Sequence, residues 1–221
     1  MDHSAYLTGL RLIATGAGVT VAISLCAIAI GFAIALPVCA ANMSGSRIAR
    51  LLGHFYVSFF RGVPLLVLLL LIYYLLPFVG LELPSFAAAA LGLGVCTAAY
   101  QAENLRGGFL IIPAGQREAA LAFSYSRYQS WRHILLPQAI RAAMPMMVNE
   151  MIAILKASSL VSVVGVADMT RVAQNIVARD VQPLLWYPAI AFIYLAINLT
   201  LAHFSHRSVG RLRRGRPEFR L

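Results

Sequence analysis

The sequence has 221 residues, of which 60% are hydrophobic and only 12% are charged, and its mean hydropathy is +0.78. A soluble domain is nearer to roughly 45–50% apolar and 25% charged, so an ordinary soluble protein is excluded. Intrinsic disorder requires low hydrophobicity and is excluded as well. The net charge of +10 would suit nucleic acid or the inner face of a membrane, and the apolar content favours the membrane.

Long stretches without charged residues divide the chain into apolar segments. Roughly 20 consecutive apolar residues cross a bilayer as an α-helix. Four stretches have this character, and a fifth has the length of a span although it contains Glu150 and Lys156. The sequence therefore predicts an all-α membrane protein with a single transmembrane domain over residues 1–221. Its five transmembrane helices are expected at about 14–41, 58–78, 84–105, 138–164 and 183–205.

The distribution of arginines in the short loops predicts the orientation in the membrane. One side of the expected bundle carries thirteen arginines, whereas the other carries only Arg11, Arg171 and Arg179. The first side is therefore expected to be cytoplasmic, with the N-terminus outside and the C-terminus inside. Residues 207–221 would form a basic cytoplasmic tail. Phe219 is the one aromatic residue among the arginines of this tail, which is not the interleaving that stacks bases, so lipid head groups are favoured over nucleic acid as its partner.

Side chains that could perform catalysis or hold a metal are sparse. The three cysteines lie in apolar runs without metal-ligand spacing. Of the five histidines only His203 and His206 lie close together, at a span end beside the basic tail, where solvation is the simpler interpretation. The sequence contains no G-x-x-x-x-G-K-[ST] phosphate loop. We therefore expect no cofactor, no metal and no catalysis, and a polytopic membrane enzyme remains a weak alternative.

The longest connection between spans, residues 106–137, is expected on the cytoplasmic side. Its first half is rich in helix formers and carries Glu118 in an early turn, where the helix dipole favours an acid. Ser126 and Gln129 then form a potential capping box for a second short helix that reaches His133. These features predict two short helices, and by themselves they fit an amphipathic linker on the membrane surface equally well.

The order of residues in this connection resembles the EAA loop of ABC importer permeases. The family pattern is E-A-A, three residues, Gly, nine residues and then I-x-L-P. Every element occurs at the same spacing here, except that Ser124 replaces the Gly. Serine tolerates a tight turn less readily than glycine, so the turn between the two short helices is expected to be less sharp. The other matching residues are Glu118, Ala119, Ala120, Ile134, Leu136 and Pro137.

Three further motifs are similar to one branch of that family, the permeases for polar amino acids of the histidine, glutamine and arginine type. Residues 61–67 read R-G-V-P-L-L-V, residues 99–108 read A-Y-Q-A-E-N-L-R-G-G, and an N-E pair precedes K-A-S-S-L at 156–160. The resemblance covers about residues 8–206. The chain departs from the branch at Leu68, where Gln is common, and at Ala157, where Asp is common. Either change would shift selectivity or mark the less substrate-engaged partner of a heterodimer.

The resemblance implies a non-catalytic permease subunit of an ATP-driven importer in a bacterial inner membrane. Its partners would be a second permease subunit in a homo- or heterodimer, two cytoplasmic ATP-binding subunits and an extracytoplasmic solute-binding protein. The loop would couple ATPase closure to alternating access through Glu118, Ala119, Ala120, Ser124, Ile134, Leu136 and Pro137. The alternative is an ATP-independent channel or secondary carrier, which would not need such a loop.

Polar groups inside the expected spans are the candidates for a substrate pathway. Ionisable side chains in a membrane are costly and usually face a cavity or a partner. Asn149, Lys156 and Ser159 share one helical stripe by their spacing. Alternatively, the charged residues pair with another span or with the second permease subunit, and Tyr100 simply packs with its hydroxyl group bonded. The candidates are Tyr100, Asn149, Glu150, Lys156 and Ser159.

A second pair of charged residues, Glu103 and Arg106, lies near the cytoplasmic end of the third expected span. The two residues are three positions apart, so their side chains meet on one face of a helix. We expect them to form an ion pair with a structural role near the loop. Residues 166–177, between the last two spans, are expected to form a short extracytoplasmic helix.

Overall fold

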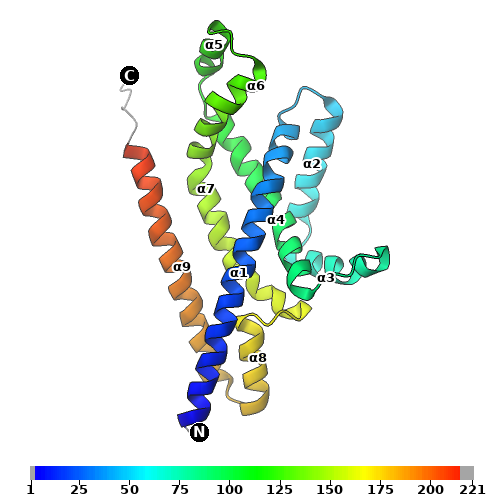
Figure 1. The fold of residues 1–221 in the computed structure, drawn as a ribbon, viewed down its shortest axis with the longest axis vertical. Helices are drawn as coiled ribbons and strands as arrows, with labels where there is room; N and C mark the ends of the chain where they lie inside the picture. Colours follow the sequence, from blue (N-terminus) through cyan, green and yellow to red (C-terminus); the bar gives the residue numbers. More distant parts are fainter. Residues whose placement is uncertain (1–2, 215–221) are drawn as a thin grey trace.

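The computed structural model describes the backbone of residues 3–214 and the side chains of residues 6–205. Within this part the protein is helical and contains no strand. The long helices run along a common direction and form an elongated bundle (Figure 1). The all-helical class predicted from the sequence is therefore confirmed.

The helices follow one another with short connections. The first half of the chain contains α1 (His3–Asn42), α2 (Arg47–Gly62), α3 (Leu65–Leu75), a 3₁₀ turn η1 (Leu76–Val79) and α4 (Ser85–Leu110). The second half contains α5 (Ala114–Ala122), α6 (Arg127–Gln129), a π-helical segment η2 (Ser130–Leu135), α7 (Leu136–Ala157), a 3₁₀ segment η3 (Ser158–Val164), α8 (Met169–Asp180) and α9 (Pro183–Arg214).

Four helical stretches in the described part are long and apolar enough to cross a membrane: Tyr6–Asn42, Ser85–Leu110, Arg127–Val164 and Pro183–Ser205. These stretches contain most of the expected spans 14–41, 84–105, 138–164 and 183–205. The expected span 58–78 is not one continuous helix, because α2 and α3 meet there at an angle of 106°. Pro64 lies at this break and disfavours a helical conformation in the residue before it, Val63, which is extended.

Helix α4 is the centre of the bundle and packs most extensively against α1 and α7. Its buried positions are mostly alanine and glycine, which let neighbouring backbones approach closely. A Cβ atom at Gly94 would lie 2.6 Å from Ile30 of α1, and one at Gly108 would collide with the Ala139 carbonyl oxygen of α7. Small residues on α4 therefore allow its close contact with α1 on one side and with α7 on the other.

The two ends of the bundle carry different elements (Figure 1). One end holds α5, α6 and the turn between α1 and α2, and α9 runs towards this end. The other end holds α8 and the start of α1. The expected N-out, C-in orientation stays a prediction, because this arrangement does not identify the membrane sides. The expected tail 207–221 lies outside the residues whose side chains are described.

A buried polar cluster holds α8 in place. Asp168 caps the helix by accepting hydrogen bonds from the backbone N–H groups of Thr170 and Arg171, both at 3.0 Å. Tyr194 of α9 donates to the same carboxylate at 3.4 Å, and Thr20 of α1 accepts from the Met169 N–H at 3.1 Å. Burial raises the pKa of the Asp168 carboxyl group, while these hydrogen bonds lower it. The expected helix at 166–177 thus occurs as α8, anchored to both neighbouring long helices.

The first and last long helices also meet at this end of the bundle. The Trp186 side chain of α9 is fully buried. Its ring stacks on Tyr6 with a centroid distance of 5.7 Å and occupies the space next to Gly9, where a Cβ atom would collide with the indole ring. The absence of a side chain at Gly9 of α1 therefore leaves the space that the Trp186 ring of α9 occupies.

Candidate functional site

The connection between α4 and α7 contains α5, and a defined turn ends this helix. The Tyr125 N–H donates to the Ala120 carbonyl at 3.0 Å, and the Ser124 N–H donates to the Leu121 carbonyl at 2.9 Å. These two bonds constitute a Schellman motif, in which one residue adopts the left-handed conformation usually supplied by Gly. That residue is Ser124, with φ of 57°. It occupies the position of the Gly in the EAA pattern.

The side chains of α5 divide into an inward and an outward set. Ala120 is buried, with 2% of its surface exposed, and α5 packs against η2. Glu118 and Ala119 are exposed, and so are the large apolar side chains of Leu121 and Phe123. The first alanine of the pattern is therefore available to a partner, whereas the second supports the internal packing of the connection.

The second helix of the connection begins as the sequence predicts. Ser126 accepts from the Gln129 N–H at 3.2 Å, and the Gln129 side chain accepts from the Ser126 N–H at 2.9 Å, which completes the capping box. The expected end near His133 is wrong, because α6 passes through η2 directly into α7. The helix continues because Pro137 lies in the first turn of α7, where its missing N–H group is tolerated.

The I-x-L-P residues lie where the connection joins the bundle. Ile134 and Leu136 are partly buried against a core cluster that includes Leu105 and Ala139. Gln138 donates hydrogen bonds to the Ile134 carbonyl at 3.0 Å and to the Gln116 side chain of α5 at 3.4 Å. Helix α5 is therefore joined to α7 by polar contact as well as by packing.

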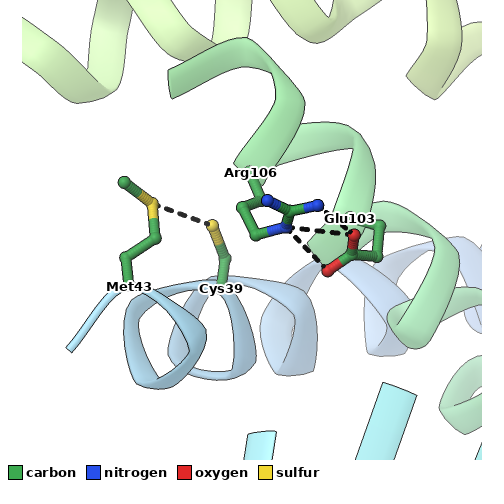
Figure 2. A network of polar contacts seen from close by, with 4 residues as sticks. All are labelled: Cys39, Met43, Glu103 and Arg106. Carbon is green, nitrogen blue, oxygen red and sulfur yellow. Dashed lines mark hydrogen bonds and ion pairs between the residues drawn. The ribbon is translucent and has the colours of Figure 1, made fainter. Parts of the chain in front are cut away.

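The expected ion pair in the third span is present. Arg106 and Glu103 form a two-pronged contact, with Nη2 at 2.8 Å from Oε2 and Nε at 3.0 Å from both carboxylate oxygens. Figure 2 shows the pair on α4 facing the end of α1, where the Cys39 thiol lies 4.0 Å from the Met43 sulfur atom. The pair is satisfied along a single helix, which fits a structural role.

Two of the expected pathway residues lie beside polar partners from other helices. Thr97 of α4 donates a hydrogen bond to Glu150 of α7 at 3.1 Å. Arg61, at the end of α2, lies over the Tyr100 ring at 5.0 Å from its centroid. Thr97 and Tyr100 are three residues apart on α4, so both contacts lie on one face of that helix. A carboxylate, a guanidinium group, a hydroxyl group and an aromatic face therefore occur together near the break between α2 and α3.

The other expected pathway residues do not join this group. Asn149 and Lys156 are exposed on α7. Ser159 lies in η3, beyond the end of α7, and its hydroxyl group donates to the Lys156 carbonyl at 2.9 Å. Ser159 therefore lies in a 3₁₀ segment beyond the helix that carries Asn149 and Lys156, and the polar stripe stays a prediction.

Sequence reasoning assigned no pathway role to Thr97 and Arg61. Thr97 is an uncharged residue in an alanine-rich span, and Arg61 entered the sequence analysis only as the first residue of the R-G-V-P-L-L-V motif. The R-G-V-P motif was the available signal, since Gly62 and Pro64 end α2 directly after Arg61. At the two positions that depart from the family pattern, Leu68 is buried and Ala157 is the last residue of α7.

Residues 27–214 match the family described as "Binding-protein-dependent transport system inner membrane component". The chain belongs to this family and is a multi-pass membrane protein. It is 36% identical over 214 residues to the glutamine transport system permease protein GlnP of Escherichia coli K12, covering 96% of this chain and 98% of that protein. It is 36% identical over 191 residues to the probable amino-acid ABC transporter permease protein YckA of Bacillus subtilis, covering 86% and 84%.

Solved structures give the same assignment. One chain of a crystal structure of an amino acid ABC transporter with histidines superimposes with a TM-score of 0.86 at 33% identity, covering 96% of this chain and 99% of that chain. An inward-facing MetNI methionine ABC transporter shares the fold, with a TM-score of 0.79 at 22% identity. The resemblance to amino-acid ABC transporter permeases seen in the sequence is thus confirmed.

Proposed function

We propose that this chain is the membrane-spanning permease subunit of an ATP-driven importer for polar amino acids. Family membership supports this function, together with relatives named as amino-acid and glutamine permeases at 36% identity. The sequence has no phosphate loop, so the ATPase would be a separate subunit and this chain would be non-catalytic. The proposed complex contains a second permease subunit, two cytoplasmic ATP-binding subunits and an extracytoplasmic solute-binding protein, in a bacterial inner membrane.

Helix α5 would transmit ATPase closure to the bundle. The observation that carries this proposal is the Schellman turn at Ser124, which fixes the direction of α5 against η2. Glu118, Ala119, Leu121 and Phe123 are exposed and form a mixed polar and apolar surface suited to a protein groove. A shift of this surface would move α5 and α7 together and bias a two-state rocking of the helices.

The polar group near the break between α2 and α3 would contact substrate. An α-amino acid carries an ammonium and a carboxylate group, and Glu150 and Arg61 supply the two complementary charges. The Tyr100 ring lies beneath the Arg61 guanidinium group, and the Thr97 hydroxyl group donates to the Glu150 carboxylate. Polar residues inside the membrane commonly mark transport pathways, and interrupted helices often lie near binding sites. Asn149, Lys156 and Ser159 are proposed only as outer contributors, because they are not gathered with this group.

The test is isolation followed by reconstitution. The tagged chain is purified from native membranes in mild detergent, and co-purifying proteins are identified by mass spectrometry. We expect an ATP-binding subunit and a solute-binding protein. The complex is then placed in liposomes, and uptake of labelled amino acids is measured with and without ATP at the cytoplasmic face. Uptake should require both ATP and the binding protein.

A matched pair of variants separates the pathway from general stability. Glu150→Ala should lower uptake or change its amino-acid preference while leaving assembly with the ATP-binding subunit intact. Glu82→Ala, an exposed acid between η1 and α4, should leave both unchanged. Uptake by the purified chain without any ATPase would instead establish an ATP-independent channel or carrier and refute the proposal.

A further inference from the structure

A hollow of about 990 Å³ opens where the end of α1, helix α5 and segment η2 come together. Apolar and aromatic side chains form much of its lining, including Phe109, Leu121 and Trp131. Phe109 and Trp131 stack with a centroid distance of 6.1 Å and an interplanar angle of 13°. Phe109 is only 5% exposed and supports Trp131 from behind, so the apolar surface open to a hydrocarbon portion of a ligand comes mainly from Trp131 and Met43.

Two arginines, Arg117 of α5 and Arg127 of α6, line the same hollow. Neither forms an ion pair or a side-chain hydrogen bond with any residue in the described part of the chain. None of the described lining residues is acidic. Two uncompensated positive charges thus border one apolar hollow, and this arrangement favours an anion with an apolar part.

Ser130 supplies a third, independent feature of the hollow. The residue is only 5% exposed and lines the hollow. Its hydroxyl oxygen is buried and has no hydrogen-bond partner among the described residues. Buried hydroxyl groups are nearly always hydrogen-bonded, so an unpartnered one in a hollow points to a ligand atom that completes the bond.

We propose that this hollow binds an anionic phospholipid of the cytoplasmic leaflet. The phosphate group accepts hydrogen bonds from Arg117, Arg127 and the Ser130 hydroxyl, and the acyl chain lies on Met43 and Trp131. Guanidinium groups are well suited to phosphate, and basic pockets between helices on the cytoplasmic side hold lipid head groups. A lipid fits better than soluble phosphate, because inorganic phosphate would leave the aromatic surface in water.

The position of the hollow agrees with a lipid. It lies where α1 and α4 end and α7 begins, at the end of the bundle that the arginine distribution predicts to be cytoplasmic. This site goes beyond the proposed transport function, which requires no bound lipid. A lipid here would contact both α1 and α5 and so would join the loop to the membrane surface.

The two tryptophans of the chain make the site measurable. Trp131 lines the hollow, whereas Trp186 is fully buried at the opposite end of the bundle. The complex is placed in nanodiscs that contain either phosphatidylglycerol or phosphatidylcholine with brominated acyl chains, at equal mole fraction. Bromine quenches tryptophan fluorescence at short range. In the Trp131→Phe variant the remaining signal comes from Trp186 and from the tryptophans of the partner subunits, and the difference from wild type gives the Trp131 signal.

We expect Trp131 to prefer phosphatidylglycerol over phosphatidylcholine by on the order of tenfold in apparent affinity, as two basic residues at an anionic surface should give. The double variant Arg117→Gln/Arg127→Gln should lose this preference, and Ser130→Ala should weaken it. Arg47→Gln/Arg50→Gln is the matched control. It removes the same charge from exposed residues of α2 outside the hollow and should keep the preference.

Three results would overturn the proposal. Equal quenching by the two lipids would show that the hollow does not select an anion. Equal loss in both double variants would show a general surface-charge effect. Loss of quenching when inorganic phosphate is added would assign the hollow to a soluble anion, and quenching seen only after the ATP-binding subunits are stripped from the complex would assign it to the protein interface. None of these results depends on transport, so they leave the proposed function to its own test.

Discussion

Replacing Ser124 by glycine tests whether the turn after α5 is limited by its backbone conformation. Ser124 has φ of 57° and supplies the left-handed residue of the Schellman motif. An L-residue in this conformation carries a steric cost between its Cβ atom and the following carbonyl oxygen, and glycine does not. The substitution Ser124→Gly should therefore stabilise the turn.

The magnitude follows from two opposing effects. Removing the Cβ atom relieves about 1–2 kcal/mol. Glycine also increases the freedom of the unfolded chain, which costs about 0.4–1 kcal/mol. The net stabilisation of the turn is about 0.8 kcal/mol, which corresponds to a local opening equilibrium reduced about fourfold.

Hydrogen–deuterium exchange of the assembled complex measures this opening. The amides of Ser124 and Tyr125 donate to the carbonyls of Leu121 and Ala120 and exchange only when the turn opens. The Tyr125 amide should exchange about fourfold more slowly in Ser124→Gly than in wild type. Ser124→Ala keeps a Cβ atom and is the control, so its rate should not fall. Equal rates in the glycine and alanine variants would refute the steric argument.

Three further predictions concern other parts of the molecule. Gly108→Ala should lower the free energy of unfolding by about 1–3 kcal/mol in thermal unfolding, because the new Cβ atom would collide with the Ala139 carbonyl oxygen. Gly107→Ala is the control and should be tolerated, because its Cβ atom would lie 4.0 Å from the Met146 side chain. Since burial raises the pKa of Asp168 in the folded state, that carboxyl group stabilises the fold in acid and loses this contribution as pH rises through its folded pKa. Asp168→Asn should remove this pH dependence, which amounts to about 1.4 kcal/mol of unfolding free energy per unit of pKa difference. The measurement is the slope of melting temperature against pH, and the exposed control Asp180→Asn should keep the wild-type slope. Glu118→Lys should preserve membrane insertion but reduce substrate-stimulated ATPase activity at least about tenfold, as charge reversal at an interface would, and the control Glu82→Lys should not. Unchanged stimulation in Glu118→Lys would remove Glu118 from the coupling surface.

The apolar runs predicted the places of the four long helical stretches Tyr6–Asn42, Ser85–Leu110, Arg127–Val164 and Pro183–Ser205, because charged residues are rare in this chain. The break between α2 and α3 was missed. From Gly62 to Leu81 the sequence contains no charged residue, so charge does not separate α3 from the end of α2, and only the backbone restriction of proline interrupts the helix. A rule based on charge alone cannot detect a bend inside an uncharged stretch.

The candidate site shows the same division between local and tertiary information. The capping box at Ser126 and Gln129 and the pair of Glu103 and Arg106 were predictable, because both join residues three positions apart. The contact of Thr97 with Glu150 was not, because it joins two helices far apart in the sequence, and no local pattern records which faces meet.

The packing of Trp186 against Gly9 and Tyr6 has a consequence for biosynthesis. This contact joins residues from nearly opposite ends of the chain, so it can form only after almost all of the protein has been synthesised. Until then the N-terminal part of α1 lacks the indole ring that fills the space beside Gly9. A chain truncated before α9 would keep this end of α1 open. The contact of Trp186 with Tyr6 and Gly9 therefore forms only in a chain whose last long helix, α9, has been synthesised and packed against α1.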